Sequence, residues 1–192
     1  MSRQFWNETL SWATAAGTAI ASSTTETVIF PNITIPANYL ADGRCLRLRI
    51  FGAYGTTGTP TLIFALRWGG VAGTVIAKSA TVTTTSGVGG GASMTAPWSM
   101  EALIQVRSNG AAGTLMTSGE VILYTSTAAT AGTVTNYGLP LFLASGSTGG
   151  TTPVAVAVDL TTDTALSVTA LWGTNNAANS LRGDQYTLET LN

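Results

Sequence analysis

Hydrophobic and polar residues alternate along most of the chain after residue 26, with the two-residue period of a β-strand whose faces meet different environments. The clearest example is the segment 44–54, in which Leu46, Leu48 and Ile50 fall on one face and polar or charged residues fall largely on the other. No segment keeps the 3.6-residue period of a helix over three turns. The pattern therefore predicts an all-β domain of antiparallel strands.

The same alternation, bounded by clusters of Gly, Pro, Ser and Asn, predicts further strands. They cover residues 27–30, 33–35, 61–68, 73–82, 98–107, 114–124, 137–143, 154–160, 166–172 and 186–191. The linker 55–60 carries a turn signal, so we expect the strands on either side of it to form a hairpin or a short crossover. This number of strands suits an antiparallel β-sandwich of the jelly-roll type best, with an immunoglobulin-like sandwich as the second choice.

Residues 1–25 differ from the rest of the chain. Phe5, Trp6 and Trp12 stand in a polar segment rich in Ala, Ser and Thr, at a spacing that fits neither a regular helix nor a regular strand. We interpret this segment as an N-terminal arm that precedes a sandwich domain over 26–192. Burial of a large aromatic side chain is worth a few kcal/mol, so these rings are expected to pack either on the parent domain or on another chain.

The composition excludes several classes of function. The 192 residues include 8 Lys and Arg against 9 Asp and Glu, one Cys and no His. A chain without histidine has no Ser-His-Asp or Cys-His relay, and one cysteine forms neither an internal disulfide nor a cysteine-rich zinc site. The formal net charge of -1 lacks the basic excess of a nucleic-acid-binding protein. The chain has no apolar run of about 20 residues, so the sequence predicts no membrane partner.

The acidic residues are scattered and predict no catalytic pair or metal site. Asp159 and Asp163 are close in sequence, but they bracket the turn LTTDT, where Asp commonly hydrogen-bonds to the backbone. Cys45 begins a strand and has no neighbouring base, so we expect it to be a small buried hydrophobic residue. We therefore expect no enzyme activity, no cofactor and no metal.

Three arginines occupy strong predicted strands, on the face opposite the aliphatic residues: Arg47, Arg49 and Arg67. This face is either solvated or meets a neighbouring subunit, where the arginines would pair with carboxylates such as Glu101 or Glu120. Apolar residues at the same outward positions favour an interface, as does the scarcity of charge, because a net charge near zero promotes association.

Three segments together resemble a group of tailed-bacteriophage virion proteins: GTPTLIFALRWGG (58–70), APWSMEALIQVRSNGAAGTLMTSGEVIL (96–123) and TDTALSVTALWGTNNAANSLRGDQYTLETLN (162–192). The group comprises small jelly-roll structural proteins that serve as capsid cement or decoration proteins, head fibres or tail-associated proteins. The resemblance covers roughly residues 44–192. It implies a homotrimer on the virion, made in the host cytoplasm, and no catalysis.

The first functional hypothesis is a trimeric capsid cement or decoration protein that stabilises the head by bridging subunits of the major capsid protein or another virion protein. In this hypothesis Phe5, Trp6 and Trp12 contact the capsid. The expected subunit interface contains Arg47, Arg49, Arg67 and Glu101.

The alternative is a head- or tail-fibre module that binds a host receptor or glycan. Jelly-roll domains host lectins, and three tryptophans could stack on sugar rings: Trp68, Trp98 and Trp172. All three alternate in phase with aliphatic residues, which favours packing in the core instead.

Overall fold

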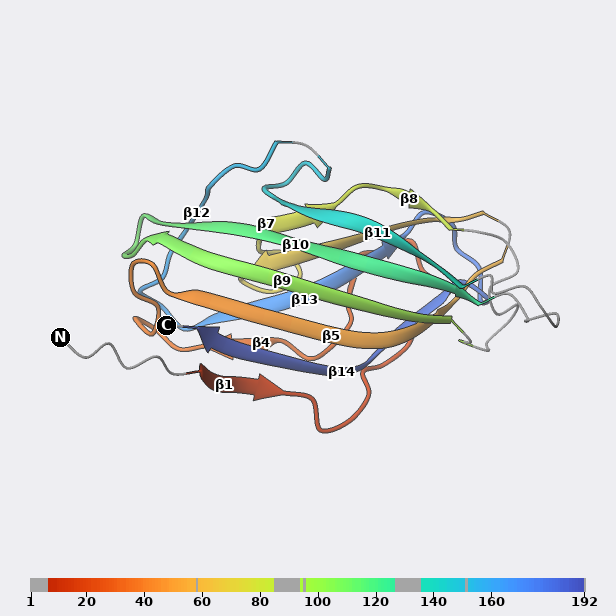
Figure 1. Ribbon diagram of the computed structural model, residues 1–192, viewed down its shortest axis with the longest axis horizontal. Helices are drawn as coiled ribbons and strands as arrows, with labels where there is room; N and C mark the ends of the chain where they lie inside the picture. Colours follow the sequence, from red (N-terminus) through yellow and green to blue (C-terminus); the bar gives the residue numbers. More distant parts are fainter. Residues whose placement is uncertain are drawn as a thin grey trace.

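The computed structural model describes residues 7–57, 59–84, 94, 96–126, 136–150 and 152–191. Every regular element in this part of the chain is a β-strand, and all the strand pairings are antiparallel (Figure 1). The predicted all-β, antiparallel fold is therefore confirmed. Within the same residues, no helix is long and apolar enough to cross a membrane.

The long strands follow one another along a single hydrogen-bonded path. Its first part, here called the six-strand layer, consists of β1 (Asn7–Trp12), β14 (Ser180–Leu191), β5 (Cys45–Gly55), β9 (Ala96–Ser108), β10 (Gly113–Ser126) and β11 (Asn136–Ser145). The path continues, as the second layer, through β7 (Thr74–Ser79), β6 (Thr61–Trp68), β13 (Thr164–Trp172) and β3 (Thr27–Val28). Short strands pair beside this path: β2 (Ile20–Ala21) with β14, β4 (Ile33–Ile35) with β13, β8 (Val82–Thr83) with β6, and β12 (Val156–Val158) with β10.

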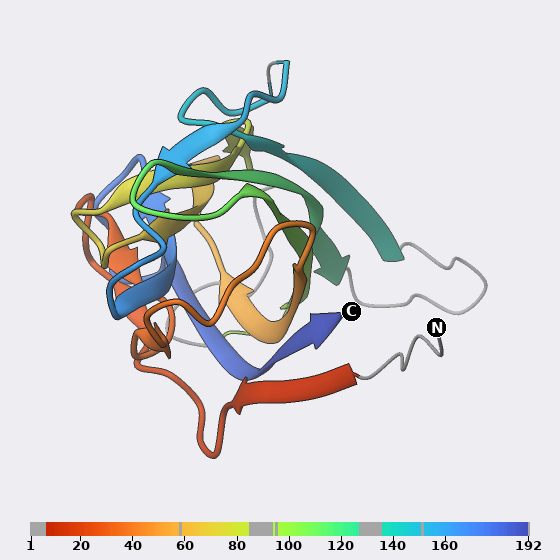
Figure 2. The ribbon, with the colours of Figure 1, turned by 90° about the vertical axis from the view of Figure 1, so that its left-hand side faces the viewer.

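The core lies between the two layers, which gives the fold a sandwich-like architecture (Figure 2). Leu46, Leu48 and Ile50 of β5 are fully buried, as their alternation predicts. The rings of Phe64 on β6 and Trp98 on β9 lie 5.1 Å apart between their centroids and so connect the two layers. The inward-facing residues of alternating strands in both layers therefore form the core.

The strands on either side of the linker 55–60 do not form a hairpin. β5 pairs with β14 and β9, whereas β6 pairs with β13, β7 and β8. The linker thus joins the two layers as a crossover, and the hairpin alternative is wrong. The physical reason is that both strands carry a buried aliphatic stripe, which they bury in one shared core from opposite layers.

The N-terminal segment contains a strand that the sequence pattern did not reveal. β1 forms the edge of the six-strand layer and pairs with β14, with a register shift between Thr9 and Ser11. Such a bulge places one extra residue in the strand, so the two-residue alternation is interrupted. This interruption explains why Leu10 and Trp12, two residues apart, do not share a face: Leu10 packs against the core, whereas Trp12 is exposed.

Residues that follow β1 link the two ends of the strand path. The Gly17 amide donates to the Gly183 carbonyl of β14 at 2.8 Å, and the Ile29 amide donates to the Val168 carbonyl of β13, also at 2.8 Å. Gly17 and Ile29 also meet closely, since a Cβ at Gly17 would lie 2.1 Å from the Ile29 carbonyl oxygen. Residues 7–29 therefore lie along the domain, and the division into an arm (1–25) and a sandwich (26–192) stays a prediction.

Candidate functional site

One row of side chains crosses the six-strand layer on the side away from the core. In order, the residues that face one another on neighbouring strands are Trp12, Thr187, Arg49, Glu101, Glu120 and Phe142. The row has an aromatic residue at each end and charged residues in the middle. We call the surface around this row the outer face; it comprises the outward-pointing residues of the six-strand layer.

Exposed hydrophobic side chains gather on the outer face. Among the described residues, seven large hydrophobic side chains are exposed, and four of them lie here. These four are Trp12 (59% exposed), Phe51 (49%), Leu103 (39%) and Phe142 (53%). Phe51 and Leu103 stand on the outward positions of β5 and β9, next to the charged row. Concentrated exposed apolar residues of this kind mark surfaces that contact another molecule.

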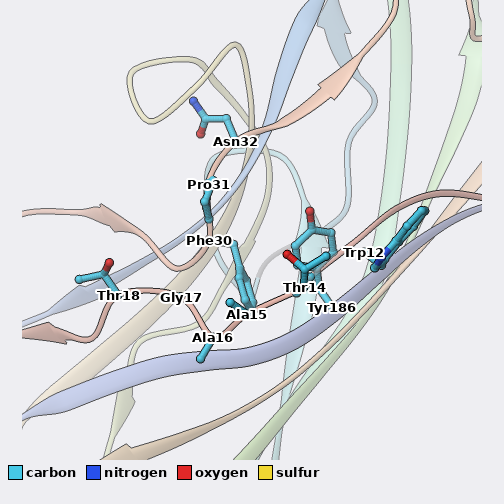
Figure 3. Close-up of a pocket in the computed structure, with 11 residues that line it drawn as sticks. Trp12, Thr14, Ala15, Ala16, Gly17, Thr18, Phe30, Pro31, Asn32 and Tyr186 are labelled. Carbon is cyan, nitrogen blue, oxygen red and sulfur yellow. The ribbon is translucent and has the colours of Figure 1, made fainter.

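Two shallow hollows adjoin Trp12. One, of about 400 Å³, lies on the outer face and includes Arg49 and Phe51 in its lining. The other, of about 260 Å³, lies between residues 12–18, at and just after the end of β1, and the Phe30–Asn32 segment (Figure 3). Its lining consists mostly of small residues, and Tyr186 is its single ionisable side chain. These hollows offer an aromatic ring and hydroxyl groups, but no pair of acid and base.

The structure brings three of the four predicted interface residues together. Arg47 and Arg49 project from β5 and Glu101 from β9, all on the outer face. Arg49 pairs with Glu101 at 3.1 Å, with both side chains nearly half exposed, and Arg47 pairs with Glu189 of β14 at 2.5 Å. Pairing of these arginines within the chain does not test pairing between subunits, which stays a prediction.

Arg67 lies away from this group, on β6 of the second layer. Its guanidinium binds both carboxylate oxygens of Glu26 at 2.6 Å, and Glu26 also accepts a hydrogen bond from the Thr169 hydroxyl. The hydrogen bonds from Arg67 hold the pKa of the Glu26 carboxyl below its ordinary value, against an opposing effect of burial. This arrangement fastens the segment before β3 to the second layer.

Two charged residues of the outer face are unpaired within the described part of the chain. Glu120 lies directly opposite Glu101 on the neighbouring strand, and it has no ion pair or hydrogen bond to any described residue. Arg107, near the end of β9, is exposed and likewise has no described partner. The sequence contains no signal for this, because the pairing state of each charge depends on the strand register.

The aromatic residues singled out in the sequence differ in their exposure to solvent. Trp68, Trp98 and Trp172 are 6%, 1% and 1% exposed, so their predicted packing in the core is confirmed. They are therefore not available for stacking on sugar rings. Trp12 is exposed on the outer face, while Phe5 and Trp6 lie outside the described residues.

The residues considered for chemistry have structural roles. Asp159 accepts hydrogen bonds from the amide and the hydroxyl of Thr161, as expected for a turn residue. Asp163 instead accepts a hydrogen bond from the amide of Ala37, a residue distant in the sequence. Cys45 is half-buried, and burial raises the pKa of its thiol, which disfavours the reactive thiolate. Within the described residues, no group of three or more Cys, Asp and Glu could hold a metal ion.

Comparison with known proteins finds no relative of the chain. No family model matches it, and no curated protein and no solved structure matches it either.

Proposed function

We propose that this protein is a non-enzymatic structural protein of a tailed-bacteriophage virion, a trimeric cement or decoration protein that stabilises the capsid. The observation that carries the proposal is the outer face, where Trp12, Phe51, Leu103 and Phe142 surround a short row of charges. Four exposed large hydrophobic residues on one sheet face favour burial against another protein.

The remaining parts of the proposal follow from this surface and from the virion-protein resemblance of three segments. The sandwich is of the jelly-roll type, and the N-terminal arm attaches it to the major capsid protein or another virion protein through Phe5, Trp6 and Trp12. The subunits of the trimer meet on the outer face through Arg47, Arg49 and Glu101, whereas Arg67, also expected there from the sequence, lies on the second layer and binds Glu26 within the chain. Three copies of a modest contact bind cooperatively to a shell, because linked sites raise the effective local concentration.

A second candidate function is a head- or tail-fibre module that binds a host receptor or glycan. It is favoured by Trp12, whose ring borders two hollows, one of which also contains Tyr186 and Asn32 (Figure 3). An exposed aromatic ring beside polar groups is suited to stacking on a sugar ring. Since the other described tryptophans are buried, Trp12 would carry this activity.

Purified particles test the cement function directly. We expect the protein to be present in hundreds of copies on the head, and particles stripped of it to lose resistance to heat. Re-addition of wild-type protein should restore that resistance, and the Trp12→Ala variant should bind stripped particles at least tenfold more weakly. Val71→Ala removes an exposed apolar side chain from the β6–β7 connection and should bind like wild type.

Three results would count against cementing: unchanged heat resistance after stripping, a copy number of only a few dozen, or equal binding by both variants. Binding of the wild-type protein to a glycan array, lost in Trp12→Ala, would instead support the fibre module.

A further inference from the structure

We propose that a second copy of this chain docks on the outer face, with the Glu120 carboxylate of one copy paired with the Arg107 guanidinium of the next. This inference rests on the proposed function, because it specifies the contact that holds the trimer together. The sequence alone did not predict that Glu120 and Arg107 pair with each other at the interface.

Glu120 occupies an unfavourable position in the isolated chain. It stands directly opposite Glu101 on the adjacent strand, where two like charges repel each other. The Arg49 guanidinium offsets only one of the two, since it contacts Glu101. Glu120 is exposed and has no ion pair or hydrogen bond with any residue that the structure describes. A cation from outside the chain would relieve this repulsion.

Arg107 supplies a cation on the same face. On β9 it follows Glu101, Leu103 and Gln105 at intervals of two, and all four residues are exposed. Its neighbours Val106 and Ser108 pair with the consecutive residues Leu115 and Thr114, so Arg107 is the extra residue of a β-bulge. Bulges commonly change the direction of a side chain, and the Arg107 side chain is exposed. Nothing in the described part of the chain pairs with it.

The two unpaired charges are too far apart to pair within one copy of the chain, but each can pair with the opposite charge of a neighbouring copy. Glu120 faces Glu101, and Arg107 lies six residues farther along β9, which corresponds to about 20 Å at the rise of a strand. One half of the face thus carries a free anion, the other half a free cation, and Leu103 lies between them. In a closed ring of three, the anionic half of each copy meets the cationic half of the next.

The charge balance of the face favours another copy over a different partner. Its cations Arg47, Arg49, Arg107 and Arg182 equal its anions in number, which are Glu101, Glu120, Asp184 and Glu189. A strongly acidic or basic partner would require a face with a net charge of the opposite sign. A face with equal and separated charges is complementary to itself, and its exposed Leu103 and Phe142 add apolar contact.

Charge reversal tests the contact. The variants are Glu120→Arg, Arg107→Glu and the double variant that exchanges both charges, with sedimentation equilibrium as the measurement. We expect a wild-type trimer, at least a tenfold weaker association for each single variant, and recovery to within threefold of wild type in the double variant. Thr34→Arg adds a cation to an exposed position of β4 in the second layer and should associate like wild type.

The outcomes separate this inference from the proposed function. A wild-type trimer that is insensitive to both single variants, or a double variant that does not recover, would overturn the Glu120–Arg107 contact and leave the virion function standing. A wild-type chain that is monomeric at high concentration would overturn the inference. If the protein is also absent from purified particles, the proposed function is overturned as well. Because association itself raises thermal stability, folding is checked by circular dichroism instead: spectra of the three variants that match wild type establish that any loss of association is not a loss of folding.

Discussion

The Arg67 guanidinium donates two hydrogen bonds of 2.6 Å to the Glu26 carboxylate, although the two residues are 41 positions apart in the chain. The Thr169 hydroxyl donates to the same carboxylate. Glu26 precedes β3, Arg67 belongs to β6 and Thr169 to β13, so three separate segments meet at one charged group. Because the pair is largely shielded from solvent, it contributes more to stability than an exposed ion pair would.

Replacement of this carboxylate should destabilise the fold. We expect Glu26→Gln to lower the free energy of unfolding by about 1–3 kcal/mol, because hydrogen bonds to charged groups contribute about that much. Denaturant unfolding at neutral pH measures the change. Asp184→Asn breaks the more exposed ion pair with Arg182 and should cost less than about 1 kcal/mol. Equal losses in the two variants would contradict the distinction.

The contribution of Glu26 should also depend on pH. Its carboxyl pKa is lowered in the folded protein from an ordinary value of 4.5, chiefly by the hydrogen bonds from Arg67. The stabilisation is therefore fully present above pH 4.5 and is lost as the pH falls through the folded-state pKa. The difference in unfolding free energy between wild type and Glu26→Gln should shrink on acidification below 4.5. A difference that stays constant over this range would refute the pKa shift.

A single methyl group at Gly17 should disturb the connection between the N-terminal segment and the sheet. A Cβ there would lie 2.1 Å from the Ile29 carbonyl oxygen, a backbone atom that moves only with its segment. We expect Gly17→Ala to lower the melting temperature and to destabilise the protein by about 1–3 kcal/mol, as overpacking does. The exposed neighbouring Ala16 provides the control, since Ala16→Ser should leave the melting temperature unchanged.

One tyrosine should titrate at unusually high pH. Burial raises the pKa of Tyr54 to about 12, and its hydroxyl donates to the Tyr124 carbonyl at 3.0 Å. Alkaline titration followed by ultraviolet absorbance should show a phenol with this pKa in wild type and not in Tyr54→Phe. The stabilisation from the neutral phenol is complete below pH 10 and is lost as the pH rises through about 12. Identical titration curves for the two proteins would disprove the assignment.

The sequence alone predicted the strands and their inner faces well. Leu46, Leu48 and Ile50 are buried as their alternation indicated, and Trp98 lies in the core rather than on the surface. These predictions hold because the direction of a side chain in a strand follows from the local backbone, which places successive residues on opposite sides. The turn role of Asp159 is equally local, since its partner is two residues away.

Other features depended on residues that are distant in the sequence. Only the tertiary structure aligned Trp12 with Phe142 in one row, separated Arg67 from Arg49, and left Glu120 opposite Glu101. The bulge that hid β1 exists only with respect to β14. Burial of an alternating strand is encoded in a few neighbouring residues, whereas pairing and register are decided by the packing of the whole chain. The sequence by itself therefore determined which residues form the core, and the tertiary structure decided which residues share the outer face.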